Sequence, residues 1–216
     1  KFIKRYFETF TLGHAYRSTY SVGSFSSNLD YKDPETGDVQ MNLNNMSYHS
    51  KYDIAQVSIN EQFSPLFKID MTWKNSLLAR FELKKSRMLS LSLSNNQLTE
   101  IASHEYVIGT GYRIKDVSFN FRAAGRSKKI NSDLDLKIDF NIRNNRTVIR
   151  KVIEDVEQIT AGQQIITIKF SADYVINQRL NVKAFYDKVI TNPFLSTTFP
   201  GAITNAGFSI RFTLAG

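Results

Sequence analysis

The residues best suited to nucleophilic or metal chemistry are few in this sequence. The 216 residues include no cysteine, which excludes thiolate nucleophiles and thiolate metal ligands. The three histidines, His14, His49 and His104, are too few for a centre built mainly of imidazole ligands. No serine lies in a G-x-S-x-G nucleophile elbow. The side chains that usually carry covalent catalysis are therefore missing or isolated.

The pair His104-Glu105 and the run Gly109-Thr110-Gly111 each have a plainer structural interpretation. Neighbouring strand residues point to opposite faces of a sheet, so His104 and Glu105 are not expected to cooperate as acid and base. The glycine run lacks the third glycine and the following helix of a dinucleotide site. Glycine in a strand more often relieves crowding or bends a barrel wall. We therefore expect no enzyme and no cofactor.

Three carboxylates offer a candidate calcium site. Asp133, Asp135 and Asp139 share one face of a predicted strand, and oxygen ligands suit calcium. Lys137 and Arg143 lie among them on the same face. A charge-balanced wall facing water is the better interpretation, and no metal site is predicted.

The elements that position these residues are indicated by a period of two. Residues 133–143 read DLDLKIDFNIR, with apolar and polar residues in strict alternation. Because successive side chains of a strand point to opposite faces, this pattern predicts a strand between apolar and polar surroundings. The same alternation recurs in residues 66–74, 76–84, 163–176 and 204–214.

About twelve strands are predicted from these runs and the turn signals between them. They lie near residues 8–26, 53–63, 66–74, 76–84, 87–95, 105–114, 117–123, 133–143, 146–158, 163–176, 180–191 and 204–214. Short turns are predicted at 64–65, 85–86, 115–116, 144–145 and 177–179, and longer loops at 29–52, 95–104, 124–132 and 192–203. Short turns thus alternate with longer connections, as in outer-membrane barrels, whose periplasmic turns are short. An even strand number then puts both ends of this segment in the periplasm.

Residues 146–160 fit two structures. Val148, Ile149, Val152 and Ile153 have the spacing of an amphipathic helix. The segment is also rich in β-branched residues and follows an Asn-Asn pair, which favours a long strand with one irregularity. The strand is preferred, and the helix stays open.

Composition restricts the partners. The formal net charge is +8, but the basic residues occur as scattered pairs, such as Lys84-Lys85 and Arg150-Lys151, so no nucleic-acid partner is expected. No run approaches the ~18 apolar residues of a membrane helix. The mean hydropathy of -0.30 remains compatible with a membrane barrel, because barrel strands alternate apolar and polar residues.

Five long stretches of this sequence, taken in their order along the chain, point to a known protein family. They are HAYRSTYSVGSF (14–25), EQFSPLFKIDMTWKN (61–75), KKSRMLSLSLSNNQLTE (84–100), ITIKFSADYVINQRLNVKAFYDK (166–188) and FSIRFTLAG (208–216). Together they resemble the C-terminal region of the SprA/Sov family, the outer-membrane translocon of the type IX secretion system in Bacteroidetes. The resemblance runs from about residue 7 to the end.

The resemblance implies a fold and a function. Residues 1–216 would be the C-terminal segment of an all-β, antiparallel up-and-down transmembrane β-barrel of about 36 strands. Such barrels, which also serve gliding motility, pass folded cargo with a C-terminal targeting domain from periplasm to cell surface. The implied partners are the rest of the barrel, a PorV-type shuttle barrel, a periplasmic plug protein, cargo and outer-membrane lipid. The family brings no catalytic motif.

In this hypothesis the alternation assigns side chains to a lumen or to lipid. The lumen-facing residues would be Asp135, Lys137, Asp139, Lys169, Asp173, Lys183 and Arg211. The lipid-facing residues would be Leu134, Leu136, Ile138, Phe140, Ile142, Ile168, Phe170 and Phe212. Two alternatives remain: a self-contained small outer-membrane barrel, acting as a porin or hydrolase, and a soluble β-sandwich binding module.

Overall fold

The computed structural model describes residues 5–32, 41–42, 46–123, 126–177, 180–195 and 198–213. These residues form one antiparallel sheet of nine strands and a separate two-stranded ribbon. The chain is therefore all-β, as the alternation predicts. Within the described ranges, no helix is long and apolar enough to cross a membrane.

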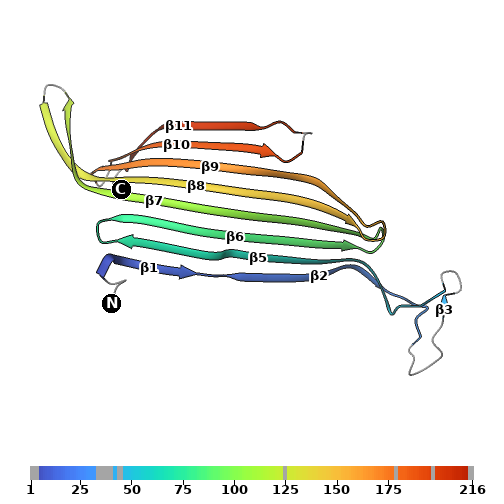
Figure 1. Ribbon diagram of the computed structural model, residues 1–216. Helices are drawn as coiled ribbons and strands as arrows, with labels where there is room; N and C mark the ends of the chain where they lie inside the picture. The colour runs from blue at the N-terminus through green and yellow to red at the C-terminus, as the bar shows by residue number, and fades with distance from the viewer. Residues whose placement is uncertain are drawn as a thin grey trace.

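The sheet has an up-and-down order, in which each strand from β5 to β11 pairs with the next one along the chain (Figure 1). Its strands are β1 (Phe7–Gly13), β2 (Tyr16–Ser27), β5 (Tyr52–Trp73), β6 (Leu77–Ser92), β7 (Gln97–Ala123), β8 (Arg126–Lys151), β9 (Val156–Asn177), β10 (Leu180–Pro193) and β11 (Gly201–Phe212). The ribbon of β3 (Met41–Asn42) and β4 (Ser47–Tyr48) lies in the long connection between β2 and β5.

The strands β1 and β2 together form one edge of the sheet, since both pair with β5. The break between them, at His14 and Ala15, lies opposite a bulge in β5. There the backbone N–H of Ala15 donates to the carbonyl of Pro65 at 2.8 Å, and Ser64 donates to Ala15 at 3.2 Å. The predicted strand 8–26 is thus two strands in line.

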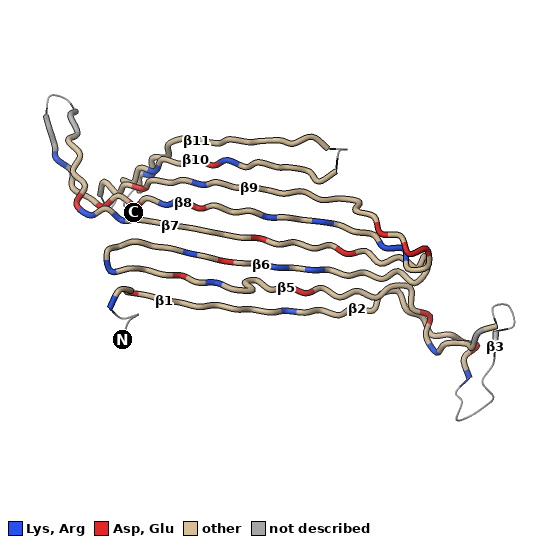
Figure 2. The backbone as a smooth tube through the Cα atoms, in the orientation of Figure 1, with Lys and Arg blue, Asp and Glu red and all other residues tan. Residues whose placement is uncertain are grey.

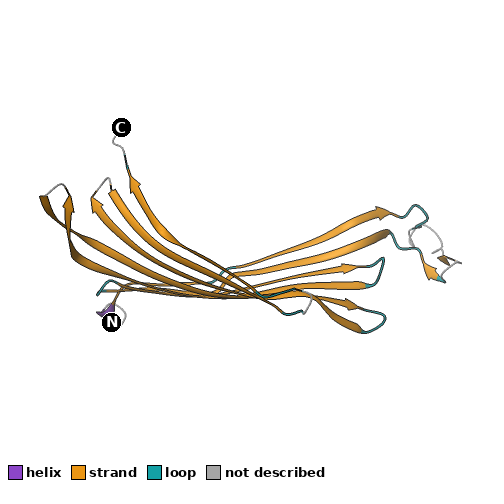
Figure 3. Cartoon of the chain, turned by 90° about the horizontal axis from the view of Figure 1, so that it is seen from above, coloured by secondary structure: helices purple, strands orange, loops and turns teal. Residues whose placement is uncertain are grey.

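The sheet is a single curved layer with both faces uncovered (Figure 3). Its accessible surface is 15938 Å², whereas a compact protein of this mass exposes about 10,000 Å². Only Val107, Val148 and Tyr174 are buried apolar residues among those described. A β-sandwich would bury one face of each sheet, so the sandwich alternative is wrong for this fold.

The strands are fewer and longer than the sequence predicts. The predicted turns at 64–65, 85–86, 115–116 and 144–145 lie inside β5, β6, β7 and β8. The predicted loop 95–104 is wrong from Gln97 on, where β7 begins, and the predicted loop 124–132 is wrong from Arg126 on, where β8 begins. Residues 124–125 lie outside the described residues, as does Leu214 at the predicted end of the last strand.

Cross-strand pairing explains why these turn signals fail. Asn144 and Asn145 pair with His104 and Ser103 on β7, and the Ser103 hydroxyl donates to the Asn145 side chain at 2.7 Å. The Asn-Asn pair therefore lies in a ladder, without the positive φ that a two-residue hairpin turn needs. The short connections of this fold accordingly lie elsewhere, between β5 and β6, between β7 and β8, and between β9 and β10.

Two of the failed signals still mark irregularities. The segment at Ser64 and Pro65 is a bulge in β5, and the ladder of β7 with β8 shifts between Ile114 and Val117. Asp116, in that second shift, has a φ of 56°, which fits a bulge residue. Turn-forming residues here bend strands without reversing them.

The remaining connections agree better with the sequence. The tight connection predicted at 177–179 and the long one at 29–52 are confirmed, because β10 begins at Leu180 and β5 at Tyr52. In 146–160 the helix is wrong, and so is the single long strand, because a turn at 152–155 reverses the chain between the end of β8 at Lys151 and the start of β9 at Val156. The chain enters and leaves the sheet at the same end (Figure 1), opposite the long 28–51 connection.

Candidate functional site: the two faces of the sheet

One face of the sheet carries an apolar band that crosses seven strands. The cross-strand partners form five rows that lie side by side. The central row is Met71, Ala79, Thr110, Ile138, Phe170, Tyr186 and Ala206. On β8 the band comprises Leu134, Leu136, Ile138, Phe140 and Ile142. At about 3.4 Å per residue, these eight steps extend about 27 Å along the strand.

On β8 the residues of the band are exposed or half-buried. Ile108, Ile138 and Phe170 on its central strands are exposed at 52%, 46% and 36%. Its charged exception is Lys188, which pairs with Ile168 and Thr204 near the β11 edge. A continuous apolar surface of this size marks contact with a membrane or another molecule.

Aromatic side chains gather at both ends of the band. Tyr106 lies in the row at one end, and Tyr174 lies in the row at the other. Tyr174 meets Phe119 edge-on at 4.9 Å between ring centroids, and Phe7 on β1 lies 5.0 Å from Trp73 on β5. Tyr106, Tyr174 and Trp73 combine an apolar ring with a polar group, which suits a boundary between apolar and wet surroundings.

The registers place charged residues of alternating sign on the opposite face, and Figure 2 shows where basic and acidic residues occur along the strands. In one row Asp70, Arg80, Asp139, Lys169 and Asp187 follow each other, with Gly109 between Arg80 and Asp139. Oppositely charged residues of this face form ion pairs both within one strand and between neighbouring strands. The ion pairs are Lys68–Asp70 at 2.8 Å, Lys84–Glu82 at 3.7 Å, Arg113–Asp135 at 2.6 Å, Lys183–Asp173 at 3.7 Å, and Arg80–Glu82.

One charged residue of this face is buried among those described. Glu82 is exposed at only 5%, and its carboxylate accepts a hydrogen bond from Arg80. A buried carboxylate is tolerated when cations hold it, and Arg80 and Lys84 flank Glu82 on the same strand. The polar face is thus self-neutralised, which leaves little unbalanced charge to attract a passing molecule.

The residues predicted to face lumen and lipid separate onto these two faces. The registers place Asp135, Lys137, Asp139, Lys169, Asp173, Lys183 and Arg211 on the charged face. They place Leu134, Leu136, Ile138, Phe140, Ile142, Ile168, Phe170 and Phe212 on the apolar face. Each set is brought together from several strands, whereas the identity of what touches each face stays a prediction.

The two glycines of the 109–111 run open a shallow depression on the charged face. A Cβ on Gly109 would lie 2.5 Å from the Asp139 carboxylate, and one on Gly111 would lie 3.3 Å from the Leu136 carbonyl. The Asp139 side chain therefore leans across β7 toward Arg80. The run serves close packing within a strand, in keeping with the sequence interpretation.

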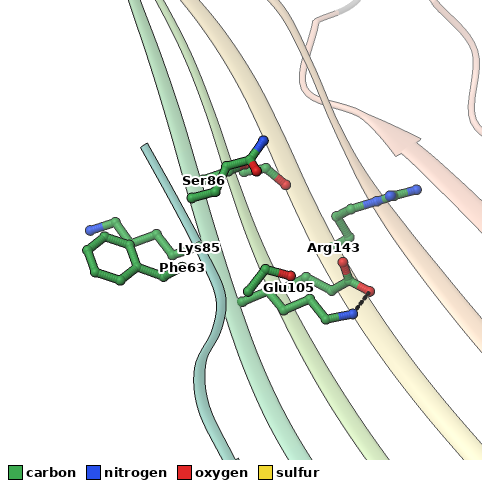
Figure 4. A pocket seen from close by; sticks show the side chains of 9 residues that line it. Phe63, Lys85, Ser86, Glu105 and Arg143 are labelled. Carbon is green, nitrogen blue, oxygen red and sulfur yellow. Dashed lines mark ion pairs between the residues drawn. The ribbon is translucent and has the colours of Figure 1, made fainter. Parts of the chain in front are cut away.

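A second hollow lies where the β5 bulge leaves β6 (Figure 4). It has a volume of about 280 Å³ and is lined by Lys84, Ser86, Glu105 and Arg143 among others. Lys84 reaches Glu105 at 3.9 Å. The hollow is open and polar, and Ser86 has no histidine beside it among the lining residues.

The remaining catalytic and metal candidates do not assemble. His104 and Glu105 alternate along β7, so they lie on opposite faces. Asp135 is held by two hydrogen bonds from Arg113, at 2.6 and 2.9 Å, and Asp133 accepts the Asp116 N–H. Within the described part of the chain, no cluster of three metal-ligating side chains is present.

Two groups of polar residues were missed by the sequence analysis. The ion pairs of β5 and β6 were visible as alternation in 66–74 and 76–84, but those residues were not assigned to a face. The cations Lys85 and Arg146 were missed for another reason: their neighbours were predicted to be turns. Both lie in strands, directly beside the apolar band.

Comparison with protein-family models gives no match for this chain, and comparison with curated proteins gives none either.

Proposed function

We propose that this chain is part of the wall of a large outer-membrane barrel that conducts folded proteins from the periplasm to the cell surface. The observation that carries the proposal is the division of one single-layer sheet into an exposed apolar band and a charged face. A band of about 25 Å, bordered by aromatic residues, is the outer surface of outer-membrane barrels. The nine residues of β8 from Leu134 to Ile142 have about the length of one tilted transmembrane strand.

The membrane-spanning parts in this proposal are only short sections of long strands. They are residues 67–73 of β5, 77–83 of β6, 106–114 of β7, 134–142 of β8, 166–174 of β9, 182–190 of β10 and 202–210 of β11. A transmembrane strand needs about 9–11 residues, whereas β7 has 27. The wall therefore continues beyond the membrane as sheet.

The open edges support membership of a larger barrel. The edge strands β1, β2 and β11 each have one neighbour among the described residues, and the β11 edge does not pair with the β1–β2 edge. Inside lipid, unpaired backbone groups cost several kcal/mol each, so further strands must cover both edges. The same fact disfavours a self-contained small barrel.

The charged face suits a lumen that folded cargo must pass. Ion pairs between neighbouring strands keep the face hydrated and close to neutral, which limits adhesion of a passing protein. The resemblance to the SprA/Sov family supplies the type of cargo and the proposed partners, a PorV-type shuttle barrel and a plug protein. The short-turn end, where both described ends lie, would face the periplasm.

Labelling of introduced cysteines tests the face assignment, because residues 1–216 contain no cysteine, and the unsubstituted native protein gives the background labelling. In the native membrane, a charged maleimide should react with Lys137→Cys and spare Ile138→Cys, while a lipid-soluble maleimide shows the reverse. Equal reaction at both positions would contradict a wall between lipid and lumen. A denatured mass near 24.8 kDa for the native protein would contradict a larger barrel.

The protein-conducting role needs its own test. Depletion of the native protein should leave folded, C-terminally tagged cargo in the periplasm and remove it from the cell surface. Unchanged cargo export after depletion would contradict the proposed function, even if the barrel itself is confirmed.

A further inference from the structure

The apolar band ends abruptly toward the long-connection end of the sheet. The last row of the band on β6, β7 and β8 is Leu83, Tyr106 and Ile142. On the same face, two residues further along each strand, two polar rows begin, which we call the boundary rows. The first is Lys85, His104, Asn144 and Gln164, and the second is Arg87, Ala102, Arg146 and Gly162.

The cations of the boundary rows are available to a ligand. Lys85, Arg87, His104 and Arg146 are all exposed. Arg87 donates from Nε at 2.9 Å and from one terminal nitrogen at 2.6 Å to Glu61, which leaves its other terminal nitrogen unused in that pair. Among the described residues Arg146 has no ion-pair partner.

Two guanidinium groups flank a small residue. Ala102 pairs with Arg87 on one side and with Arg146 on the other. Neighbouring strands lie about 4.8 Å apart, so the two arginine backbones are about 10 Å apart with only a methyl group between them. Arginine presents a planar fork of donors that matches phosphate oxygens, and Lys85 adds a point charge one row closer to the band.

An aromatic ring lies beside the second boundary row. The Phe194 side chain lies over Gly162, whose Cβ would be 2.7 Å from the ring, and Phe194 is 48% exposed. It therefore lies beside Arg146 with an apolar surface turned outward. Outer-membrane barrels carry aromatic residues in girdles at both membrane interfaces.

We infer that the boundary rows bind the phosphate groups of membrane lipids, with Arg87, Arg146, Lys85 and His104 as donors. This inference rests on the proposed function, because it requires the apolar band to face lipid. The acyl chains of such a lipid would cover the band, and its phosphate would lie at the level of the boundary rows. The long 28–51 connection places these rows on the cell-surface side, so the ligand is a phosphorylated lipid of that leaflet.

The chain offers a matched control for this inference. Lys84 lies next to Lys85, and Arg143 lies three residues from Arg146, about 10 Å along the strand, but their parity along β6 and β8 puts them on the charged face. The test variant is Lys85→Gln with Arg146→Gln, and the control is Lys84→Gln with Arg143→Gln. Both remove two positive charges. Because Lys84 also pairs with Glu82 and Glu105, the inserted amount of each variant is measured before bound lipid is compared.

The assay uses the full native protein in nanodiscs of phosphatidylcholine with a small fraction of phosphatidic acid. Native mass spectrometry counts the phosphatidic acid molecules that stay bound when the disc is removed. The wild type and the control should retain them, and the test variant should retain several-fold fewer. Inorganic phosphate at millimolar concentration should not displace the lipid, since the acyl chains contribute to binding; displacement would reduce the site to a general anion site and overturn the inference.

The remaining outcomes separate this inference from the proposed function. Loss of phosphatidic acid in the control and its retention in the test variant would reverse the two faces and refute the proposed wall. Equal retention in wild type, test and control, with cargo export intact, would overturn the lipid inference alone.

Discussion

Replacing Ile138 with arginine tests the membrane band at its most sensitive point. Ile138 lies in the third of the five rows on β8, with Leu134 and Ile142 four residues away on either side. At about 3.4 Å per residue, those two end positions are about 14 Å from Ile138 along the strand. Ile138 therefore marks the midplane of the band, and the end positions mark its two interfaces.

The expected cost follows from this depth. Arginine on the lipid face of a barrel costs about 2–4 kcal/mol at the midplane and about 0–1 kcal/mol near an interface. At about 1.4 kcal/mol per factor of ten, Ile138→Arg should lower the ratio of inserted to uninserted protein by about 30- to 700-fold. Leu134→Arg and Ile142→Arg should lower it by less than about 6-fold.

The assay compares arginine variants at all five apolar positions of β8 in the full native protein. The protease-resistant fraction in the outer membrane reports insertion, and Lys137→Gln on the other face is the control. Insertion should be lowest for Ile138→Arg and should recover toward both ends of the series. A flat profile, a minimum at Leu134 or Ile142, or an equal defect in the control would refute the reasoning.

Two further predictions concern the sheet beyond the band. Glu61 lies outside the membrane-spanning part of β5, and hydrogen bonds from Arg87 lower the pKa of its carboxyl. These hydrogen bonds stabilise the fold above the pKa that Glu61 has in the unfolded chain, and their contribution is lost as the pH falls through the lower pKa of the folded state. The unfolding midpoints of the wild type and of Glu61→Gln should therefore converge as the pH falls through that range. A difference that stays constant with pH would contradict the pairing. Gly162→Val places a side chain against Phe194, which should cost about 1–3 kcal/mol of stability and lower the thermal unfolding midpoint. Gly201→Val is the control, because Gly201 has open space around it and the midpoint should stay unchanged. Equal midpoints for the two variants would contradict the packing.

The chemistry of the two faces could be predicted from the sequence. In 133–143 the alternation separates Leu134 through Ile142 from Asp135 through Arg143, and the registers keep these sets on opposite faces. The physical reason is local, because side-chain direction in a strand follows from backbone geometry alone. The same reasoning correctly kept His104 and Glu105 apart.

The ends of the strands were not predictable in the same way. Asn144-Asn145 and Lys85-Ser86 have turn-forming composition, yet both pairs continue through a ladder. The choice between a turn, a bulge and a straight strand depends on what the neighbouring strand offers. At Asn145 that neighbour offers Ser103 as a hydrogen-bond donor, 42 residues away in the chain.

The sequence by itself determined the class of fold, the separation of alternating residues onto two opposite sides and the absence of cysteine chemistry in these 216 residues. Which residues lie beside each other across the strands was decided by the tertiary structure alone. The apolar band, the ion-pair ladders and the boundary rows of Lys85 and Arg146 exist only because the registers of β6, β7 and β8 bring distant residues to one height. A shift of one residue in any register would exchange the faces of that strand, so register carries information that alternation within one strand does not contain.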